Sequence, residues 1–402
     1  MDLLTSDLSN YYMDLHIHIG RTKSGKPVKI TASNQLTLTS ILEESLTRKG
    51  LDIVGVIDAQ SPEVLEEVAE LIRNGEAVEL SDGGIRYQES LTLVLGAELE
   101  IYDESSKGPI HVLCYFPTVK LMEVFSAWCS KRLKNIGLSS QRIYVTGREL
   151  QKKVKELDGW FIPAHVFTPF KSLYGKGVNI SLTEVLIPEL IDAVELGLSS
   201  DTTMADQLME LWSYPFLTNS DAHSVSKIGR EHQIVRLARP NFAEITKAFK
   251  NKDGRMIVEN IGLHPRLGKY YGTTCRRCEE TEKMCSCTSK GKNSLIKGVA
   301  ERIKELAVKQ QMNLNIQSAM YSKIKRPPYL HQIPLEFIPG CGPKTLNRLL
   351  DVFKTEMKVL HEVKDEKLKE VIPVKIAERI IQARTGKFTL IEGGGGTYGK
   401  MK

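Results

Sequence analysis

The sequence lacks the features of membrane-embedded, secreted and disulfide-bonded proteins. Its 402 residues contain no run of about 18 apolar residues, the length that a membrane span requires. The first ten residues carry two aspartates and neither a basic residue nor an apolar stretch, unlike a secretory leader. Three of the seven cysteines are scattered, which is a poor disulfide framework. We therefore expect a soluble, cytoplasmic protein with reduced thiols and no membrane partner.

Charge is distributed unevenly along the chain, which is long enough for two or three domains. Residues 1–263 hold 28 Lys+Arg and 35 Asp+Glu, a net charge of −7. Residues 264–402 hold 27 and 14, a net charge of +13. A basic C-terminal third favours a module that binds a polyanion beside a separate catalytic body. A merely solvated basic surface explains the charge equally well.

Short apolar runs alternate with amphipathic segments over the first two-thirds of the chain. The expected strands are Tyr12–Ile17, Ile53–Ile57, Leu91–Leu95, His111–Tyr115, Trp160–Pro163, Ala193–Glu195, Phe216–Thr218 and Met256–Val258. Helices are expected over segments such as 38–49, 62–73 and 241–250. Alternation of strands and helices predicts a parallel sheet, and about eight repeats suggest an α/β barrel.

Ligand-type side chains stand at or just after the ends of several expected strands, where the loops of a βα fold converge. In His16-Ile17-His18 the two imidazoles are two residues apart, so they share one face of a strand. Asp221-Ala222-His223 repeats this spacing. The full candidate set is His16, His18, Glu98, His111, His165, Asp221 and His223. Each residue alone could be a satisfied buried polar group, but the set favours a metal centre.

Mixed imidazole and carboxylate ligation suits Zn²⁺, Mn²⁺ or Fe²⁺ better than Mg²⁺, which prefers oxygen ligands. Two or three divalent ions close together can polarise a phosphodiester, generate hydroxide near neutral pH and stabilise the leaving oxygen. Phosphoester hydrolysis is therefore the expected reaction, with Asp221, His18 and Glu98 as its central residues.

A compact cysteine cluster follows the barrel segment. Cys275, Cys278, Cys285 and Cys287 lie within thirteen positions of polar, basic sequence. Four thiolates at such spacing can close a tetrahedral structural Zn²⁺ site, without which so polar a segment could hardly fold. A redox role for these thiols is the alternative.

A glycine-rich turn in the C-terminal third precedes an apolar helical pattern. Gly340 and Gly342 flank Cys341, and Lys344 and Thr345 follow. The pattern predicts a helix–hairpin–helix whose backbone N–H groups face a DNA phosphate. Residues 368–383 contain a poorer second copy, and a plain helix corner is the alternative for each. The tail ends in a glycine run, Gly393–Gly396, that predicts a flexible segment.

The ligand set resembles that of the PHP (polymerase and histidinol phosphatase) family, which implies a distorted seven-stranded βα barrel with a three-metal rim. Two departures stand out. The family usually has an acidic residue shortly after its first His-x-His, where this chain has Gly20-Arg21. It also usually has Thr-Asp-His after the second strand, where this chain has Ile57-Asp58-Ala59. Asp58 remains a candidate ligand, whereas Ala59 cannot bind a metal.

The order of barrel, four-cysteine element and helical hairpin resembles the endonuclease Q family over nearly the whole chain. This resemblance implies a barrel over residues 1–268, a zinc element over 269–292 and a helical DNA-binding domain over 293–402. It also implies cleavage of single- and double-stranded DNA on the 5′ side of uracil, hypoxanthine, xanthine and abasic sites. Archaeal relatives act with a sliding clamp, but the tail here carries no clear clamp-binding peptide.

Such an enzyme must flip the base into a pocket beside the metals. The resemblance implies Ser199 and Asn219 as base-binding residues. One amide, that of Asn219, offers both a donor for the base carbonyl and an acceptor for the ring N–H. The alternatives are that Ser199 caps the next helix and that Asn219 only orients a ligand.

Two rival functions remain open at this stage. Another PHP hydrolase, an exonuclease or a small-molecule phosphatase, would share the ligand set. A catalytically inactive DNA-binding protein would share the basic tail.

Overall fold

The computed structural model describes residues 7–278, 295–313, 322–394 and 396–401. Its centre is an eleven-stranded sheet with the order β15-β12-β11-β1-β2-β5-β4-β3, in which β6 and β7 also pair with β5, and β8 pairs with β6. These strands are β1 (Ser9–Ile17), β2 (Ile53–Val56), β3 (Ala77–Glu79), β4 (Ile85–Tyr87), β5 (Leu91–Ile101), β6 (Ile110–Phe116), β7 (Arg142–Ile143), β8 (Trp160–Pro163), β11 (His232–Leu237), β12 (Met256–Gly262) and β15 (Tyr329–His331).

The sheet is mixed, which corrects the expected parallel arrangement. Strand β2 runs parallel to β1 and β5, but β11 is antiparallel to β1, and β6 is antiparallel to β5 and β8. Residues 102–109 join β5 to β6, and a parallel crossover needs about a dozen residues or more. The chain must therefore turn back on itself there. Each predicted strand coincides with an observed one, whereas β11 is absent from the predicted set.

A parallel pair, β9 (Val194–Glu195) and β10 (Phe216–Leu217), continues from the main sheet. The Asp192 N–H donates to the Phe161 carbonyl of β8 at 3.1 Å, and the Thr218 hydroxyl donates to the His232 carbonyl of β11 at 2.7 Å. The strands so linked share an apolar core cluster that includes Leu15, Ile53, Val94, Leu113, Ile162 and Leu217. The polar residues that follow these strands therefore meet at one end of this core.

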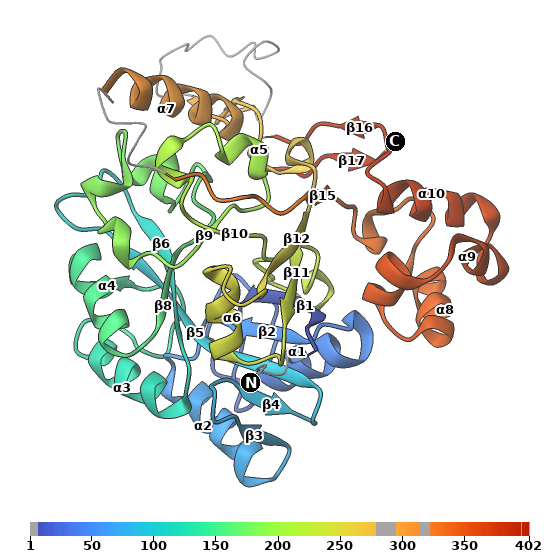
Figure 1. Cartoon of the computed structure of the whole chain (residues 1–402), viewed down its shortest axis with the longest axis horizontal. Helices are drawn as coiled ribbons and strands as arrows, with labels where there is room; N and C mark the ends of the chain where they lie inside the picture. The colour runs from blue at the N-terminus through green and yellow to red at the C-terminus, as the bar shows by residue number, and fades with distance from the viewer. Residues whose placement is uncertain (1–6, 279–294, 314–321, 395, 402) are drawn as a thin grey trace, which may run out of the picture.

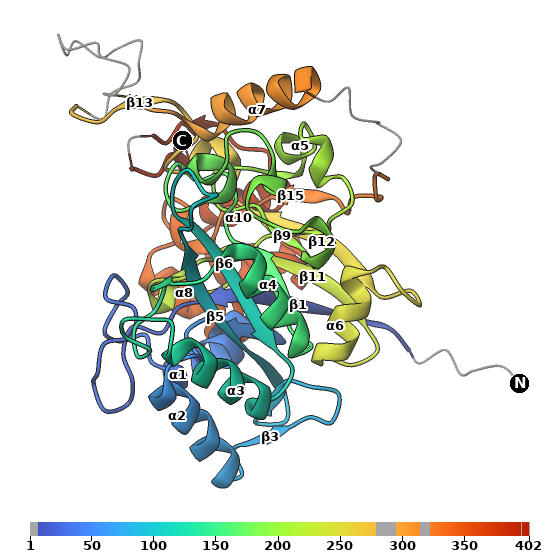
Figure 2. The same cartoon turned by 90° about the vertical axis from the view of Figure 1, so that its left-hand side faces the viewer.

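Helices cover the outside of the sheet. They are α1 (Leu38–Glu44), α2 (Pro62–Arg73), α3 (Val119–Ser130), α4 (Gly147–Glu156), α5 (Thr202–Ala205), α6 (Phe242–Phe249), α7 (Val299–Asn313), α8 (Pro343–Phe353), α9 (Asp365–Val371) and α10 (Val374–Arg384). Figure 1 shows α2, α3 and α4 on one side of the molecule and α8–α10 on the other, while α7 lies at the end occupied by α5 in Figures 1 and 2. Among the described helices none has the length and apolar character of a membrane span.

The C-terminal third is not purely helical, in contrast to the expected helical domain over 293–402. Strand β15 adds to the main sheet parallel to β12. The tail forms an antiparallel pair, β16 (Leu390–Ile391) with β17 (Lys400–Met401). It docks on residues 266–269, because the N–H groups of Gly393 and Gly399 donate to the carbonyls of Arg266 and Leu267 at 2.7 and 2.9 Å.

Of the glycine run predicted to be flexible, Gly393, Gly394 and Gly396 belong to this docked hairpin, and Gly395 lies outside the described residues. A Cβ on Gly393 would lie 2.7 Å from the Gly268 carbonyl oxygen, and one on Gly399 would lie 2.3 Å from the Ile391 carbonyl oxygen. The glycines therefore allow close backbone approach here rather than forming a loose linker.

A buried carboxylate before β11 makes stability depend on pH. Glu231 is fully buried, its Oε1 accepts from the Leu263 N–H at 2.8 Å, and burial raises its pKa to about 8. A folded-state pKa above the unfolded value gives stability below about pH 4.5 that is lost as pH rises toward 8. At 1.36 kcal/mol per pKa unit, we expect the wild type to lose about 3 kcal/mol more between pH 5 and pH 8 than Glu231→Gln.

Denaturant unfolding of both proteins at the two pH values checks this expectation. The amide can still accept the Leu263 hydrogen bond but does not titrate. Equal pH dependence of the two proteins would contradict the assignment of the buried charge to Glu231.

Candidate metal centre and adjoining pocket

The predicted ligands meet at one end of the enclosed core. His16 lies on β1, Glu98 on β5 and His111 on β6, whereas His18, His165, Asp221 and His223 follow the ends of β1, β8 and β10. The bridge between Ile17 and Ala222 brings the β1 end beside the 219–223 segment, and the His18 N–H donates to the Ala222 carbonyl at 3.1 Å. All seven residues come within one small region.

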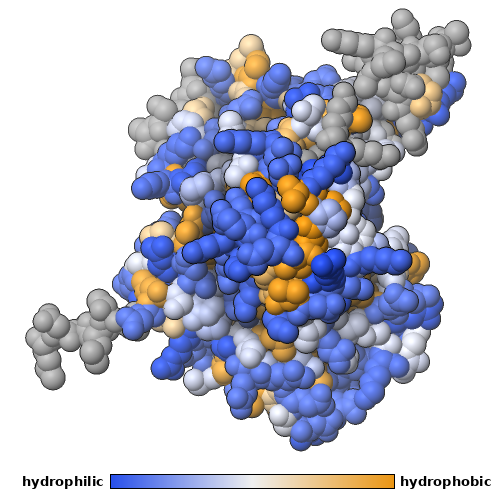
Figure 3. Space-filling model, turned by 90° about the vertical axis from the view of Figure 1, so that its right-hand side faces the viewer, coloured by the Kyte–Doolittle hydropathy of each residue, from blue (hydrophilic) through white to orange (hydrophobic). Residues whose placement is uncertain are grey.

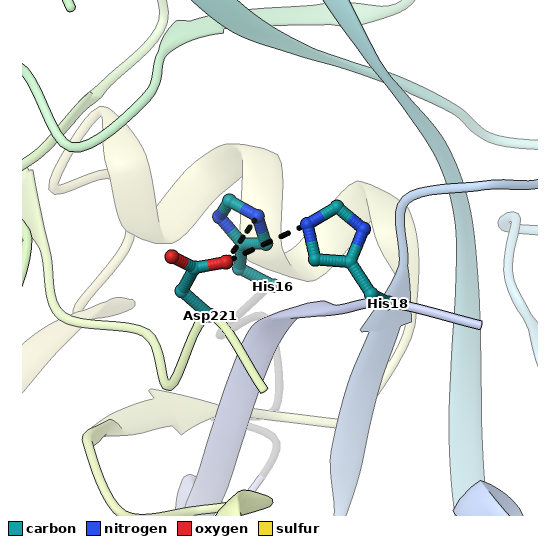
Figure 4. Close-up of side chains that lie close together, drawn as sticks. All are labelled: His16, His18 and Asp221. Carbon is teal, nitrogen blue, oxygen red and sulfur yellow. Dashed lines mark ion pairs between the residues drawn. The ribbon is translucent and has the colours of Figure 1, made fainter. Parts of the chain in front are cut away.

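The ligand atoms form two groups of three. His16, His18 and Asp221 make one group, and Glu98, His111 and His165 make the other. Asp221 Oδ1 lies 3.4 Å from His16 Nε2 and 3.5 Å from His18 Nε2 (Figure 4). Figure 4 shows both rings directed toward this carboxylate from the end of β1. Each group has the composition and spacing to hold a divalent ion.

Glu98 connects the two groups. Its Oε1 accepts from His111 Nδ1 at 2.8 Å and lies 3.8 Å from His16 Nε2, while its Oε2 lies 3.6 Å from His18 Nε2. A carboxylate with one oxygen toward each group has the geometry of a bridging ligand. Burial opposes ionisation, but the positive charges of His111 and Lys29 hold the pKa of Glu98 well below its usual value.

Two further carboxylates orient the imidazoles. Glu195 accepts from His16 Nδ1 at 2.9 Å, and Asp58 Oδ2 accepts from His18 Nδ1 at 3.2 Å and from the Ile19 N–H at 2.7 Å. Such bonds fix the Nδ1–H tautomer and direct Nε2 toward a metal. Asp58 belongs to neither ligand group. Asp58 thus supports His18, and because its Oδ1 is buried without a hydrogen-bond partner among the described residues, its expected role as a metal ligand stays a prediction.

Buried nitrogen atoms test whether the residues fit an ion. Nε2 of His16 and Nε2 of His18 are buried and have no hydrogen-bond partner in the described part of the chain. A buried polar atom without a partner is costly, so its orientation toward the centre implies a partner that the protein does not supply. Burial and the nearby His18 lower the pKa of His223 to about 4, which keeps its ring in the neutral form that binds metals. The residues fit divalent metal ions.

Two of the ligands adopt unusual backbone conformations. His165 has a φ of 30° and Asp221 a φ of 46°, although neither is a glycine. Arg230 supports the second, because its Nε donates to the Ser220 carbonyl at 2.8 Å and Nη2 reaches the Asp221 carbonyl at 3.4 Å. Left-handed conformations of non-glycine residues carry strain that is commonly retained at functional sites.

A pocket of about 460 Å³ opens beside the metal ligands. Ser199 and Asn219, the expected base-binding residues, are among the residues that line it. The Ser199 hydroxyl accepts from the Tyr270 N–H at 3.3 Å and does not cap a helix, because Asp201 caps α5 by accepting from the Met204 N–H at 2.8 Å.

The hydrogen bonds of Asn219 change the role expected for it. Its Oδ1 accepts from the Leu15 N–H at 2.9 Å and from Gln233 Nε2 at 3.1 Å, and its Nδ2 donates to Glu195 Oε1 at 2.8 Å. Both lone pairs of the oxygen are thus occupied, so the amide cannot also supply the acceptor for a base. One N–H of Nδ2 is left for the pocket. Asn219 also holds Glu195, the carboxylate that orients His16. This is the role described by the alternative in which Asn219 orients a ligand.

The pocket lining also contains residues that the sequence interpretation does not include. Arg230, Lys269 and Tyr398 are among them, and Arg230 Nη1 donates to the Tyr398 hydroxyl at 2.9 Å. The Lys269 ammonium lies 4.7 Å from the centre of the Tyr398 ring. Tyr398 belongs to the docked C-terminal hairpin. It is far along the chain from the other pocket residues, so the sequence does not indicate that it lines the pocket. Glu195 could have been identified from the sequence, because it is a carboxylate at the end of an expected strand, where metal ligands are expected.

The remaining predicted residues that the structure describes belong neither to the ligand groups nor to the pocket lining. Cys275 is buried in β13 (Thr274–Cys275), which pairs with β14 (Leu295–Ile296), and Cys278 is exposed. Cys285 and Cys287 lie outside the described residues, so the four-cysteine zinc site stays a prediction. Gly340, Gly342, Lys344 and Thr345 lie at the start of α8, and none of them lines the pocket.

Comparison with known proteins gives matches along the whole chain. Residues 200–253 match the family described as "PHP-associated". The uncharacterized protein YqxK of Bacillus subtilis is 54% identical over 397 residues, covering 98% of this chain and 100% of YqxK. The uncharacterized protein MJ0043 of Methanocaldococcus jannaschii is 37% identical over 258 residues, covering 58% of this chain and 31% of MJ0043.

Solved structures identify the family. The lesion-specific endonuclease PfuEndoQ from Pyrococcus furiosus is 31% identical with a TM-score of 0.79, and the match covers 98% of this chain and 95% of PfuEndoQ. The chain belongs to the endonuclease Q family. An endonuclease Q complex with a 27-mer duplex substrate carrying an abasic lesion at its active site matches with a TM-score of 0.80, 31% identity and coverage of 98% and 96%. The mixed α/β fold described above is therefore the PHP-like fold of endonuclease Q.

Proposed function

We propose that this protein is a metal-dependent DNA repair endonuclease. It hydrolyses the phosphodiester on the 5′ side of deaminated bases and abasic sites, and it flips the damaged nucleotide into the pocket beside the ligand groups. The observation that carries the proposal is the pair of ligand groups joined by Glu98 at the edge of a pocket of about 460 Å³. The relatedness to a lesion-specific endonuclease and to an endonuclease Q bound to abasic duplex DNA supports the choice of substrate.

The two groups would each hold one divalent ion, with Glu98 between them and His223 beside His18 and Asp221 of the first group. Zn²⁺ suits these ligands, and Mn²⁺ and Mg²⁺ are the alternatives. Ions held by these residues would supply the Lewis acidity that polarises a phosphodiester and activates water, and in-line attack by that water would leave 3′-hydroxyl and 5′-phosphate ends. The side chains of Glu195 and Asp58 keep the imidazoles oriented, and Lys29 adds a fixed positive charge beside Glu98.

The base would be recognised by residues of the pocket wall. Uracil and hypoxanthine share a carbonyl where cytosine and adenine carry an amino group. The available N–H of Asn219 can donate to that carbonyl, and Ser199 lines the same pocket. Because Asn219 Oδ1 is occupied, the acceptor for the ring N–H must come from another group. An abasic nucleotide needs neither contact.

The domain organisation supports DNA binding by the C-terminal third. We infer that β1, β2, β5, β6, β8, β9 and β10 close into the seven-stranded barrel within residues 1–268, followed by the zinc element and the DNA-binding segment. Gly340 has a φ of 91°, and the Arg379 guanidinium of α10 donates to the Pro339 carbonyl at 2.8 Å, which ties α10 to the turn before α8. Figure 3 shows this face of the molecule as hydrophilic areas with an apolar strip between them. We propose a helix–hairpin–helix at α8, with Lys344 and Thr345 near a DNA phosphate.

Cleavage of defined oligonucleotides tests the function. Single-stranded and duplex DNA carrying one uracil, hypoxanthine or abasic site, and an undamaged strand, are incubated with the protein and Mg²⁺, Mn²⁺ or Zn²⁺. We expect one nick immediately 5′ to each lesion and none in undamaged DNA. A ladder of products would indicate an exonuclease, and hydrolysis of a small phosphate ester alone would indicate a phosphatase; either result contradicts the proposal.

A further inference from the structure

An exposed isoleucine stands at the mouth of the metal centre. Ile30 is 74% exposed and lines a second pocket, of about 410 Å³, together with His18, Glu98 and His165. The other pocket-lining apolar side chain with large exposure is Phe170, at 39%. An apolar side chain so exposed gains nothing from the fold, and its position beside the reactive centre is the reason to ask what covers it.

The turn that carries Ile30 is firmly anchored. The Ala32 N–H donates to the Lys29 carbonyl at 3.0 Å, which makes Ile30 and Thr31 the two central residues of the turn. The Lys29 N–H donates to the Ile19 carbonyl at 2.9 Å, and the Ser33 N–H donates to the His223 carbonyl at 2.8 Å. The turn is therefore tied at both ends to residues that adjoin the ligands, and Ile30 is held at its apex.

Contacts of the Lys29 side chain also fix the position of the turn. Its ammonium lies 3.1 Å from Glu98 Oε2 and also donates to the Ser140 hydroxyl. The apex consequently has a fixed position relative to the metal centre. A rigid apolar tip at a set distance from the scissile bond is the arrangement needed to enter a base stack, whereas a mobile loop would lose side-chain and backbone entropy on insertion.

We propose that Ile30 is the wedge that occupies the gap left in the duplex when the damaged nucleotide leaves the stack; this rests on the proposed function. Extruding a nucleotide exposes the faces of the neighbouring bases to water, and an inserted apolar side chain covers them. Phe170 is the less suitable residue because it is already packed edge-on against Tyr270, with ring centres 5.7 Å apart, and the Lys176 ammonium lies 5.4 Å from its ring centre. The partner of the exposed Ile30 side chain is thus the base-pair step beside the lesion.

The wedge is needed for duplex DNA and has no gap to fill in a single strand. The test measures single-turnover cleavage of uracil-containing DNA in both forms by wild type, Ile30→Ala and Ile30→Leu. We expect the duplex-to-single-strand rate ratio to fall at least about tenfold in Ile30→Ala and to be largely kept by Ile30→Leu. Val78→Ala is the matched control, since Val78 is 60% exposed on β3 and lines neither pocket.

A second measurement reports unstacking directly. Fluorescence of 2-aminopurine placed next to the lesion should rise on binding of wild type and rise less with Ile30→Ala. An unchanged rate ratio in Ile30→Ala, or an equal loss on both substrates, overturns the wedge while leaving the endonuclease intact. Failure of the wild type to cut either uracil substrate is a different result, which overturns the proposed function together with the wedge.

Discussion

Replacing Asp221 should abolish cleavage of lesion-containing DNA and leave DNA binding in place. Its Oδ1 lies within 3.5 Å of the Nε2 atoms of both His16 and His18, so its removal takes one of three ligands from that group. Loss of a ligand that positions the reactive centre should lower kcat by at least about a thousandfold. Binding should persist because the net charge of +13 lies in residues 264–402.

The measurement combines single-turnover cleavage with a binding titration of the same uracil oligonucleotide at fixed salt. Asp221→Asn accompanies Asp221→Ala, because asparagine tolerates the φ of 46° and keeps the shape of the side chain while removing its charge. Exposed Asp82 gives the control Asp82→Ala, which should cut like wild type. Cleavage by both Asp221 variants at within tenfold of the wild-type rate would remove Asp221 from the metal centre.

The ligand set could be predicted from sequence because its spacing follows from strand geometry. His16 and His18 must share a face when two residues apart in a strand, and strand ends of one sheet converge. Glu98 follows the end of an expected strand, whereas His111 opens β6 and reaches the same edge because β6 is antiparallel to β5. The mixed direction of the sheet follows from the short β5–β6 connection, which is visible in the sequence once both strand ends are known.

Residues that act through contacts between distant segments could not be predicted in this way. Tyr398 reaches the pocket only because a glycine hairpin docks on residues 266–269, a contact that no local pattern encodes. Asn219 carries a suitable amide in the sequence, but three buried neighbours occupy most of its hydrogen-bonding capacity. Side-chain chemistry thus predicts what a residue can do, while its partners determine what remains available to a substrate.

The same limitation applies to the third metal position. Gly20-Arg21 and Asp58-Ala59 indicate from sequence that ligands are altered there, but they do not say what takes their place. The structure puts the Lys29 ammonium 3.1 Å from Glu98 Oε2, with 13% of its side chain exposed. Burial alone would lower the pKa of Lys29, but the carboxylates of Glu98, Asp58 and Asp221 raise it, so the amine stays charged. We infer that Lys29 supplies fixed positive charge in place of one ion.

Lys29→Met tests this substitution of a side chain for an ion, because methionine keeps much of the length and removes the charge. A nearby ammonium repels divalent ions, so the variant should bind metal more tightly or take up one more ion per chain. It should also cut DNA about a hundredfold more slowly, because a fixed cation no longer faces the charge that develops on the phosphate. Titration calorimetry with Mn²⁺ and single-turnover cleavage measure the two effects separately.

Tighter metal binding together with slower cleavage distinguishes this electrostatic role of Lys29 from a structural one. If Lys29 only held the turn together, its loss would weaken metal binding and cleavage in parallel. Lys26→Met is the matched control, since Lys26 lies on the same segment and pairs with Glu63 at 2.8 Å from an exposed position. Unchanged metal affinity and stoichiometry in Lys29→Met would show that the ammonium is not an ion substitute, whereas tighter metal binding with slower cleavage requires a charge that acts at the centre itself.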